Sequence, residues 1–300
     1  MISVLDSPSL IECVPNFSEG RRSEVIDELT ACIQDAADVH VLHRTSDHDH
    51  NRSVITFVGS PSAVQEAAFQ AIALAAKRIN LDEHQGAHPR LGATDVVPLV
   101  PLHGVTLEQC ADFARELGKR VGTELQLPVY LYEAAATRPD RVALPDVRRG
   151  EYEALKQTIH LPERQPDFGP VTVGTAGAVI IGARPVLIAY NVFLNTDDVT
   201  IARTIASAIR YSSGGLAGVR ALGLLVNGKA QVSMNLTDYK RTPVHRVLEM
   251  IRSEATRHGV SITHSELIGL IPQDALEDAA KWYLQLHDLN ASQVLRYTHE

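Results

Sequence analysis

The chain has 300 residues, of which 45% are hydrophobic and 21% charged, so it is an ordinary globular sequence long enough for two domain-sized halves. Its net charge of −8 argues against non-specific nucleic-acid binding, and no apolar run approaches the ~20 residues that span a bilayer. Three scattered cysteines without a CxxC pair favour reduced thiols and disfavour a structural zinc site. The start of the chain lacks the basic and apolar segments of a signal peptide. We therefore expect a cytoplasmic protein with no membrane or nucleic-acid partner.

Hydrophobic spacing in the first part of the chain predicts the order β-α-β-β-α-β. The expected elements are a strand at 10–14, a helix at 22–34, strands at 39–42 and 53–58, a helix at 62–79 and a strand at 96–100. A helix at 106–124 and a strand at 128–132 follow. The segment 134–170 is rich in charge and proline, and we expect only a helical turn near 151–156 within it.

The same order of elements is predicted again after residue 182. The expected elements are a strand at 186–194, a helix capped by 195–197 and ending near 211, a hairpin of 219–226 and 230–236 joined by an Asn-Gly turn, a helix at 243–258, a strand at 262–268 and a helix at 272–286. This repeat predicts an α/β (α+β) fold of two ferredoxin-like β-α-β-β-α-β subdomains, 1–180 and 181–300, with mixed or antiparallel sheets covered by helices. Because ligands often bind at domain interfaces, we expect the site between the halves.

A histidine between two glycines is the most informative local feature. His88 lies in the segment GAHPRLGATD (86–95), and the proline after it disfavours a helical backbone at the histidine itself. Gly86 and Gly92 permit tight turns on either side. Such a histidine can titrate near neutral pH and move a proton, although a turn histidine with no chemical task is an equal alternative on local evidence.

Other polar segments allow more than one interpretation. The run 47–50 (Asp-His-Asp-His), with His84 and His88, has spacings that can hold zinc, but His and Asp are also ordinary turn residues. The glycine-rich segment 169–178 lacks lysine and leads into a strand, so it favours either a flat ligand that approaches the backbone or a flexible connector. Arg52, Arg90 and Arg184 each lie at a strand edge, where a guanidinium can bind a carboxylate or form a surface ion pair.

Several unusual motifs together resemble those of the glutamate formimidoyltransferase family, in order from about residue 11 to residue 290. They are ECVPNFSEG at 12–20, NRS at 51–53, GAHPRLGATD at 86–95, PVYLY at 128–132, GEYEAL at 150–155, DFGP at 167–170, GAR at 182–184, AYN at 189–191 and QVSMNL at 231–236. Bifunctional members carry a cyclodeaminase domain after this one, and we expect this protein to lack it.

The resemblance implies transfer of a formimidoyl group from N-formimidoyl-L-glutamate to N5 of tetrahydrofolate, a step of histidine degradation and one-carbon metabolism. It implies His88 as the general acid and base, tetrahydrofolate as co-substrate without a metal, and a homodimer. The arginines Arg90, Arg52 and Arg184 are candidates to hold substrate carboxylates. The folate-contacting residues it implies are Gly169, Pro170, Val171, Thr172, Val173, Gly174, Thr175, Ala176, Gly177 and Gly214.

One departure from the family pattern leaves the donor open. Well-studied members have glutamate before the histidine, where this chain has Ala87, and loss of that carboxylate lowers the pKa expected for His88 or changes the donor. A folate-dependent transferase with formimidoylglycine or a formyl donor, a folate-binding protein without catalysis, and a metal-dependent hydrolase using the histidines are the alternatives.

Overall fold

The computed structural model describes residues 9–294, and the chain divides into two compact units between Pro185 and Val186. Residues 1–8, for which the sequence predicts no signal peptide, lie outside the described residues. Within the described part, none of the helices has the length and apolar character required to span a bilayer. Each unit has its own hydrophobic core.

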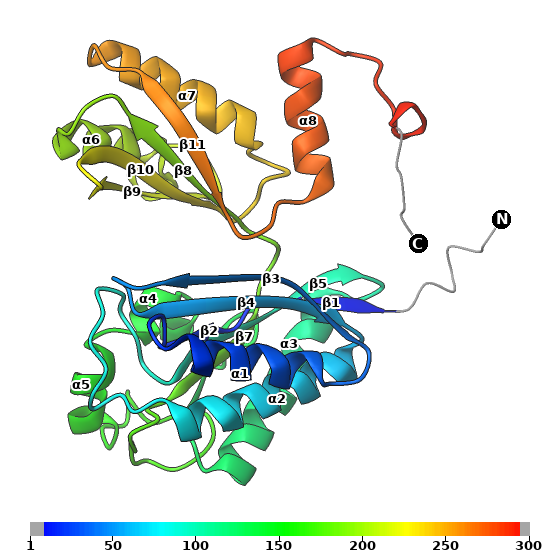
Figure 1. The fold of residues 1–300 in the computed structure, drawn as a ribbon, viewed down its shortest axis with the longest axis vertical. Helices are drawn as coiled ribbons and strands as arrows, with labels where there is room; N and C mark the ends of the chain where they lie inside the picture. The colour runs from blue at the N-terminus through cyan, green and yellow to red at the C-terminus, as the bar shows by residue number, and fades with distance from the viewer. Residues whose placement is uncertain (1–8, 295–300) are drawn as a thin grey trace. The chain divides into compact units, whose positions relative to one another are not determined.

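The first unit contains a seven-stranded sheet with helices on both faces (Figure 1). Its strands are β1 (Leu10–Cys13), β2 (Asn16–Phe17), β3 (Val39–Asp47), β4 (Arg52–Gly59), β5 (Thr94–His103), β6 (Val129–Glu133) and β7 (Val179–Ala183). Its helices are α1 (Ser23–Gln34), α2 (Pro61–Arg78), α3 (Leu107–Arg120), α4 (Leu144–Val147) and α5 (Glu151–Thr158), with short helical segments at Val121–Leu125 and Pro139–Arg141.

The first half of this sheet is ferredoxin-like. β3 pairs with β4, β4 with β1 and β1 with β5, and every one of these pairs is antiparallel. The predicted β-α-β-β-α-β fold class is confirmed here. The sequence did not predict the short strand β2, because Pro15 cannot donate a backbone hydrogen bond and interrupts the apolar run after β1.

The second half of the sheet is a parallel extension. β7 lies between β5 and β6 and runs parallel to both. All of its residues are buried, as is typical of a parallel strand covered on both faces. The predicted boundary near residue 180 lies inside β7, whereas the chain leaves the first unit after Pro185.

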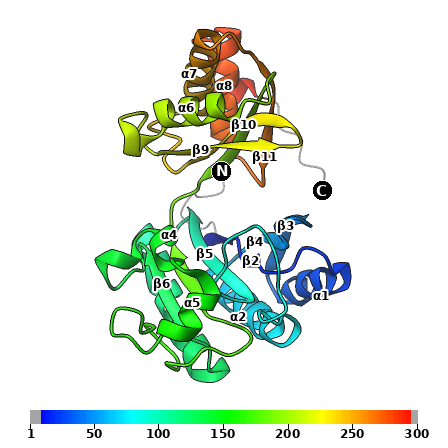
Figure 2. The ribbon, with the colours of Figure 1, turned by 90° about the vertical axis from the view of Figure 1, so that its left-hand side faces the viewer.

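Two layers of helices cover the first sheet. α1, α2 and α3 pack on one face and bury the main core, which includes Leu29, Ile72 and Leu99. On the other face, α4, α5 and the chain around them cover β6 and β7, where Tyr130, Tyr132 and Ile180 form a smaller cluster (Figure 2).

The second unit repeats the ferredoxin-like plan without an extension. Its four-stranded antiparallel sheet has the order β11-β8-β10-β9. The Asn-Gly hairpin is confirmed, since Asn227 and Gly228 have φ of 49° and 72°, as a tight two-residue turn requires. The elements are β8 (Ile188–Leu194), α6 (Val199–Ile209), β9 (Val219–Val226), β10 (Lys229–Leu236), α7 (Val244–Arg257), β11 (Ile262–Ile268) and α8 (Gln273–Leu284), with short helical turns at Tyr211–Ser213 and Ala291–Gln293.

Candidate functional site

The loop that carries His88 connects α2 to β5 and is held at its C-terminal end by three backbone contacts. Ser18 Oγ donates to the carbonyl of Gly92 at 2.7 Å, and Leu91 N donates to Asp95 Oδ1 at 2.8 Å. A Cβ at Gly92 would lie 2.1 Å from the carbonyl oxygen of Ala178, so the close approach of these two segments requires glycine. These contacts hold the segment 91–95, which directly follows the Ala87-His88-Pro89 bend.

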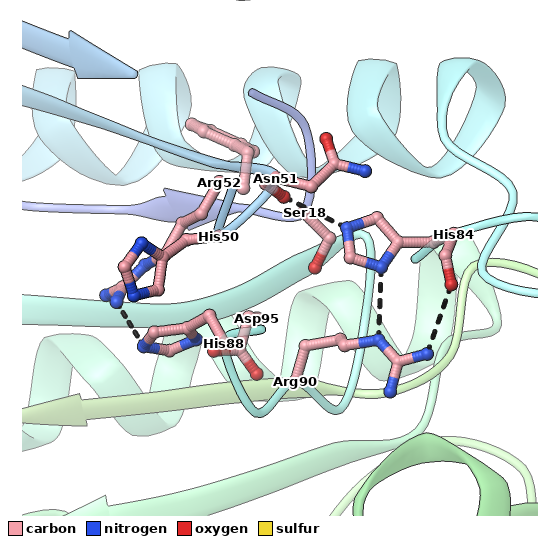
Figure 3. A pocket seen from close by; sticks show the side chains of 9 residues that line it. Ser18, His50, Asn51, Arg52, His84, His88, Arg90 and Asp95 are labelled. Carbon is pink, nitrogen blue, oxygen red and sulfur yellow. Dashed lines mark hydrogen bonds between the residues drawn. The ribbon is translucent and has the colours of Figure 1, made fainter. Parts of the chain in front are cut away.

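His88 is a neutral base in this site. The guanidinium of Arg52 donates to Nε2 of His88, so this nitrogen holds a lone pair and the ring proton is on Nδ1 (Figure 3). Burial, together with the positive charges of Arg52 and Arg148, lowers the pKa of His88 to about 3. This shift favours the neutral imidazole at pH 7.

Two arginines share one buried carboxylate beside His88. Asp95 forms an ion pair with Arg148, and its side chain is 3% exposed. Arg52 lies within electrostatic range of both, and burial lowers its pKa to about 10. The Nε atoms of Arg52 and Arg148 are buried and have no hydrogen-bond partner among residues 9–294. The site therefore has an excess of positive charge that suits an anion.

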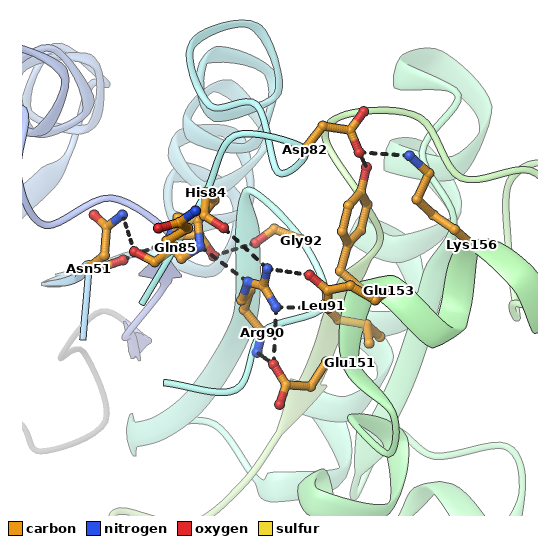
Figure 4. Close-up of polar contacts among 12 residues, drawn as sticks. Asn51, Asp82, His84, Gln85, Arg90, Leu91, Gly92, Glu151, Glu153 and Lys156 are labelled. Carbon is orange, nitrogen blue, oxygen red and sulfur yellow. Dashed lines mark hydrogen bonds and ion pairs between the residues drawn. The ribbon is translucent and has the colours of Figure 1, made fainter. Parts of the chain in front are cut away.

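Arg90 has partners of its own (Figure 4). Its guanidinium forms ion pairs with Glu153 at 2.6 Å and with Glu151 at 3.1 Å, both on α5. Its Nε donates to Nδ1 of His84 at 3.1 Å, and Nε2 of His84 donates to the carbonyl of Asn51 at 2.9 Å. With these contacts Arg90 joins the loop to α5, and its use as a receptor for a substrate carboxylate stays a prediction.

Arg184 follows β7, and its backbone N–H donates to the carbonyl of Leu99 in the middle of β5. The loop that carries His88 leads into the start of the same strand, at Thr94. The use of Arg184 for a substrate carboxylate stays a prediction. The positive charge of Arg184 acts on the nearby carboxyl of Glu12. Burial raises the pKa of Glu12 above its usual value, and Arg184 offsets part of this rise.

The glycine-rich segment predicted to contact folate lies against the His88 loop. Leu81 N donates to the carbonyl of Thr175 at 2.8 Å, and Ala93 N donates to the carbonyl of Ala176 at 2.8 Å. Gly177 has φ of 70°, and a Cβ there would lie 2.3 Å from the carbonyl oxygen of Leu91. Gly214 has φ of 89° but lies in the second unit. Its contact with folate stays a prediction, as does a site between the two halves.

A cleft of about 550 Å³ lies beside the recess that holds His88. His84 lines both the cleft and the recess. In the cleft wall, Asp82 accepts from Tyr152 at 2.8 Å and from Lys156 at 2.7 Å, and Tyr152 also donates to the carbonyl of Gly174 at 3.3 Å. The glycine-rich segment does not line the cleft itself, but Gly174 and Thr175 accept hydrogen bonds from Tyr152 and Leu81 in its wall. The cleft is lined by Leu81, Asp82, His84, Gln85, Tyr152, Glu153, Lys156 and Gln157.

The sequence did not predict Asp95, Arg148 or the cleft. Asp95 lies within the 86–95 motif, which is a usable signal, but Arg148 lies in a segment for which little structure was expected. Only the packing of that segment against the sheet places Arg148 beside Asp95, which is distant in sequence.

The histidine-rich run 47–50 forms a turn. Asp47 accepts from the backbone N–H of His50 at 2.7 Å, and both side chains are more than half exposed. The ring centroids of His50 and His88 are 6.3 Å apart. Within 9–294, no three His, Cys, Asp or Glu side chains are grouped as a metal ion would require.

Comparison of the sequence with known proteins places this chain in a family. The sequence model for the formiminotransferase domain, N-terminal subdomain, matches residues 10–184, and that for the formiminotransferase domain matches 189–296. The chain is 50% identical to a glutamate formimidoyltransferase of Thermoplasma acidophilum over 96% of both chains, and 41% identical to one of Streptococcus pyogenes over 97% of this chain and 98% of the relative.

A longer relative matches over part of its length. The chain is 42% identical to the formimidoyltransferase-cyclodeaminase of Mus musculus, covering 91% of this chain and 52% of that protein. The resemblance found in the sequence is thereby confirmed. The two domain matches and the full-length identities show that this chain belongs to the formiminotransferase family.

Proposed function

We propose that this protein transfers a formimidoyl group from N-formimidoyl-L-glutamate to N5 of tetrahydrofolate, with His88 as general base and then general acid. The observation that carries the proposal is a half-buried imidazole in a loop that backbone hydrogen bonds join to the glycine-rich segment, beside two arginines whose Nε atoms lack partners among residues 9–294. High identity to two glutamate formimidoyltransferases supports the choice of reaction.

The reaction needs one proton carrier. N5 of the folate attacks the amidine carbon and becomes cationic as the new C–N bond forms, so a base must take its proton. When the tetrahedral intermediate breaks down, the glutamate nitrogen needs a proton to leave as an amine. An imidazole can perform both transfers in turn, a contribution of ~10²–10⁴-fold. The net result moves one proton from N5 to the departing amine.

The proposed folate site is the cleft lined by Tyr152, whose hydroxyl donates to the carbonyl of Gly174 in the glycine-rich segment. A pterin is flat, and Gly174 has no atom within 4 Å of the position where a Cβ would be, so a ligand can approach the backbone there. The folate-contacting role of residues 169–177 remains part of this proposal. The same holds for a homodimer and for a cytoplasmic location, which the three free cysteines would suit.

The donor is the least constrained part of the proposal, because Ala87 replaces a family glutamate beside His88. The test is a product assay by mass spectrometry with tetrahydrofolate and, in parallel, formimidoylglutamate, formimidoylglycine and a formyl donor. We expect 5-formimidoyltetrahydrofolate from formimidoylglutamate at the highest rate, unaffected by a chelator. Folate binding without turnover of any donor would favour a non-catalytic folate-binding protein. Activity that a chelator removes and zinc restores would favour the hydrolase.

A further inference from the structure

In the unliganded site, Arg52 engages the atom that catalysis requires. A general base must present a free lone pair to the proton that it takes. Nε2 of His88 holds that lone pair, and the guanidinium of Arg52 donates to it. The imidazole is therefore blocked by a side chain of the protein itself (Figure 3).

The charges around Arg52 show what can draw it away. Arg52 and Arg148 carry two positive charges, and the ion pair of Asp95 with Arg148 compensates one of them. The Nε of Arg52 is buried and lacks a hydrogen-bond partner in the described part of the chain. A buried guanidinium whose Nε–H has no acceptor binds a carboxylate strongly, because two parallel N–H groups then donate to the two carboxylate oxygens.

We propose that a carboxylate of the donor takes the guanidinium of Arg52 into a salt bridge and thereby frees Nε2 of His88, so that the base forms only when the donor is bound. The proposal rests on the proposed function, because formimidoylglutamate supplies the carboxylate. Arg52 is then a positioning and specificity residue. Binding of the donor activates the base, His88, that takes the proton from the folate.

The surroundings of His88 give the direction of the effect. The groups that lower the pKa of His88 are Arg52 from β4, Arg148 from the segment after α4, and His50 from the β3–β4 turn. The same recess is lined by Asp95, whose carboxylate pairs with Arg148, and by His84 and Arg90, which contact each other. A carboxylate paired with Arg52 compensates the nearest of these charges and removes the hydrogen bond to Nε2. Both changes raise the pKa of His88 toward the range in which an imidazole is an effective base.

The test is a pH titration of the His88 ring by NMR in protein labelled at the histidine Cε1. His88→Gln identifies the signal among the thirteen histidines. The probe is N-formyl-L-glutamate without folate, which keeps both carboxylates and has no acceptor to react with. Its diamide, which has none, is the matched control ligand. We expect N-formyl-L-glutamate to raise the pKa of His88 by about one unit or more, the effect of one compensating charge nearby, and the diamide to leave it unchanged.

Arg52→Gln separates this inference from a general effect of ligand binding. In this variant the pKa of His88 is expected to be raised already in the free protein and to respond no further to the probe. The matched control is Arg44→Gln, which removes the same charge from an arginine on β3 that pairs with Asp27. It is expected to behave as the unmodified protein does. The KM for the donor should rise about tenfold or more in Arg52→Gln, the loss of one charge-assisted contact.

Two results overturn the inference. One is that N-formyl-L-glutamate fails to bind, or binds without moving the His88 titration. The other is that it moves this titration equally in Arg52→Gln. The comparison with and without probe in the unmodified protein needs no variant, so a variant that does not fold leaves the test intact. If the product assay shows formimidoyl transfer while the titration does not move, the proposed function stands and this inference alone fails.

Discussion

The two units share one strand order but differ in what they bury. The first unit buries charged side chains, among them Glu19, Arg90 and Asp95, next to a half-buried histidine. In the second unit, the buried polar side chains of the described residues are Gln231, Thr242 and His245. The same ferredoxin-like scaffold therefore buries acidic and arginine side chains in the first unit and none of them among the described residues of the second. The candidate site depends on these buried charges and not on the fold alone.

The strongest way to break this contrast is to remove the carboxylate that compensates the first unit's buried charge. Asp95→Asn keeps an acceptor for Leu91 N but leaves Arg148 unpaired in the interior. We expect the free energy of unfolding to fall by about 3 kcal/mol, as for other buried pairs that lose one partner. Urea unfolding followed by circular dichroism measures it, since the single tryptophan, Trp282, lies in the second unit.

Asp274→Asn is the matched control in the second unit. Asp274 is 54% exposed and lies 4.0 Å from Lys240, so its loss should change stability by less than about 1 kcal/mol. Equal losses in the two variants would contradict the contrast between the units.

The state of His88 predicts a pH dependence of stability. Its pKa is about 3 when folded and ~6.5 in an unfolded chain, so between these values the unfolded chain binds more protons. The contribution of the neutral His88 to the free energy of unfolding is complete above pH ~6.5 and is lost as the pH falls toward 3. Between pH 7 and pH 5 the unmodified protein should lose about 2 kcal/mol that His88→Gln does not lose. Parallel pH curves for the two proteins would show that the ring is not held neutral.

The smallest effect is expected at the buried histidine of the second unit. His245 stacks on Trp282 at 5.0 Å between ring centroids, and its Nδ1 has no hydrogen-bond partner in the described chain. His245→Phe keeps a ring for this stack and removes the unsatisfied nitrogen, so stability should stay constant or rise by up to about 1 kcal/mol. Tryptophan fluorescence during unfolding reports it. A loss above about 1 kcal/mol would assign His245 a polar role that its contacts do not show.

Local sequence signals predicted most elements of both units. The Asn227-Gly228 turn needs only its own two residues, and the helical spacing of α1 or α7 lies within one segment. β7 was harder, because a parallel strand pairs with segments that are far away in sequence. The sequence indicated only that the glycine-rich segment leads into a strand, and the predicted boundary near residue 180 falls within β7.

The site was predicted only in part, because some of its features are local in sequence and others join distant segments. The bend at His88 follows from Pro89 and the flanking glycines, all of which are adjacent in sequence. The pairing of Arg90 with Glu151 and Glu153, and of Arg148 with Asp95, depends on how the segment after β6 packs against the sheet. No local pattern distinguishes an arginine that braces a loop from one that awaits a ligand.

The most direct test of the central claim, that the His88 imidazole carries the proton between the two nitrogens, is single-turnover formation of 5-formimidoyltetrahydrofolate by His88→Gln. Glutamine is polar and of similar size but cannot accept and return a proton at neutral pH. The account predicts a rate lower by ~10²–10⁴-fold, with folate affinity measured in parallel and unchanged. A rate within a few-fold of the unmodified protein would contradict it.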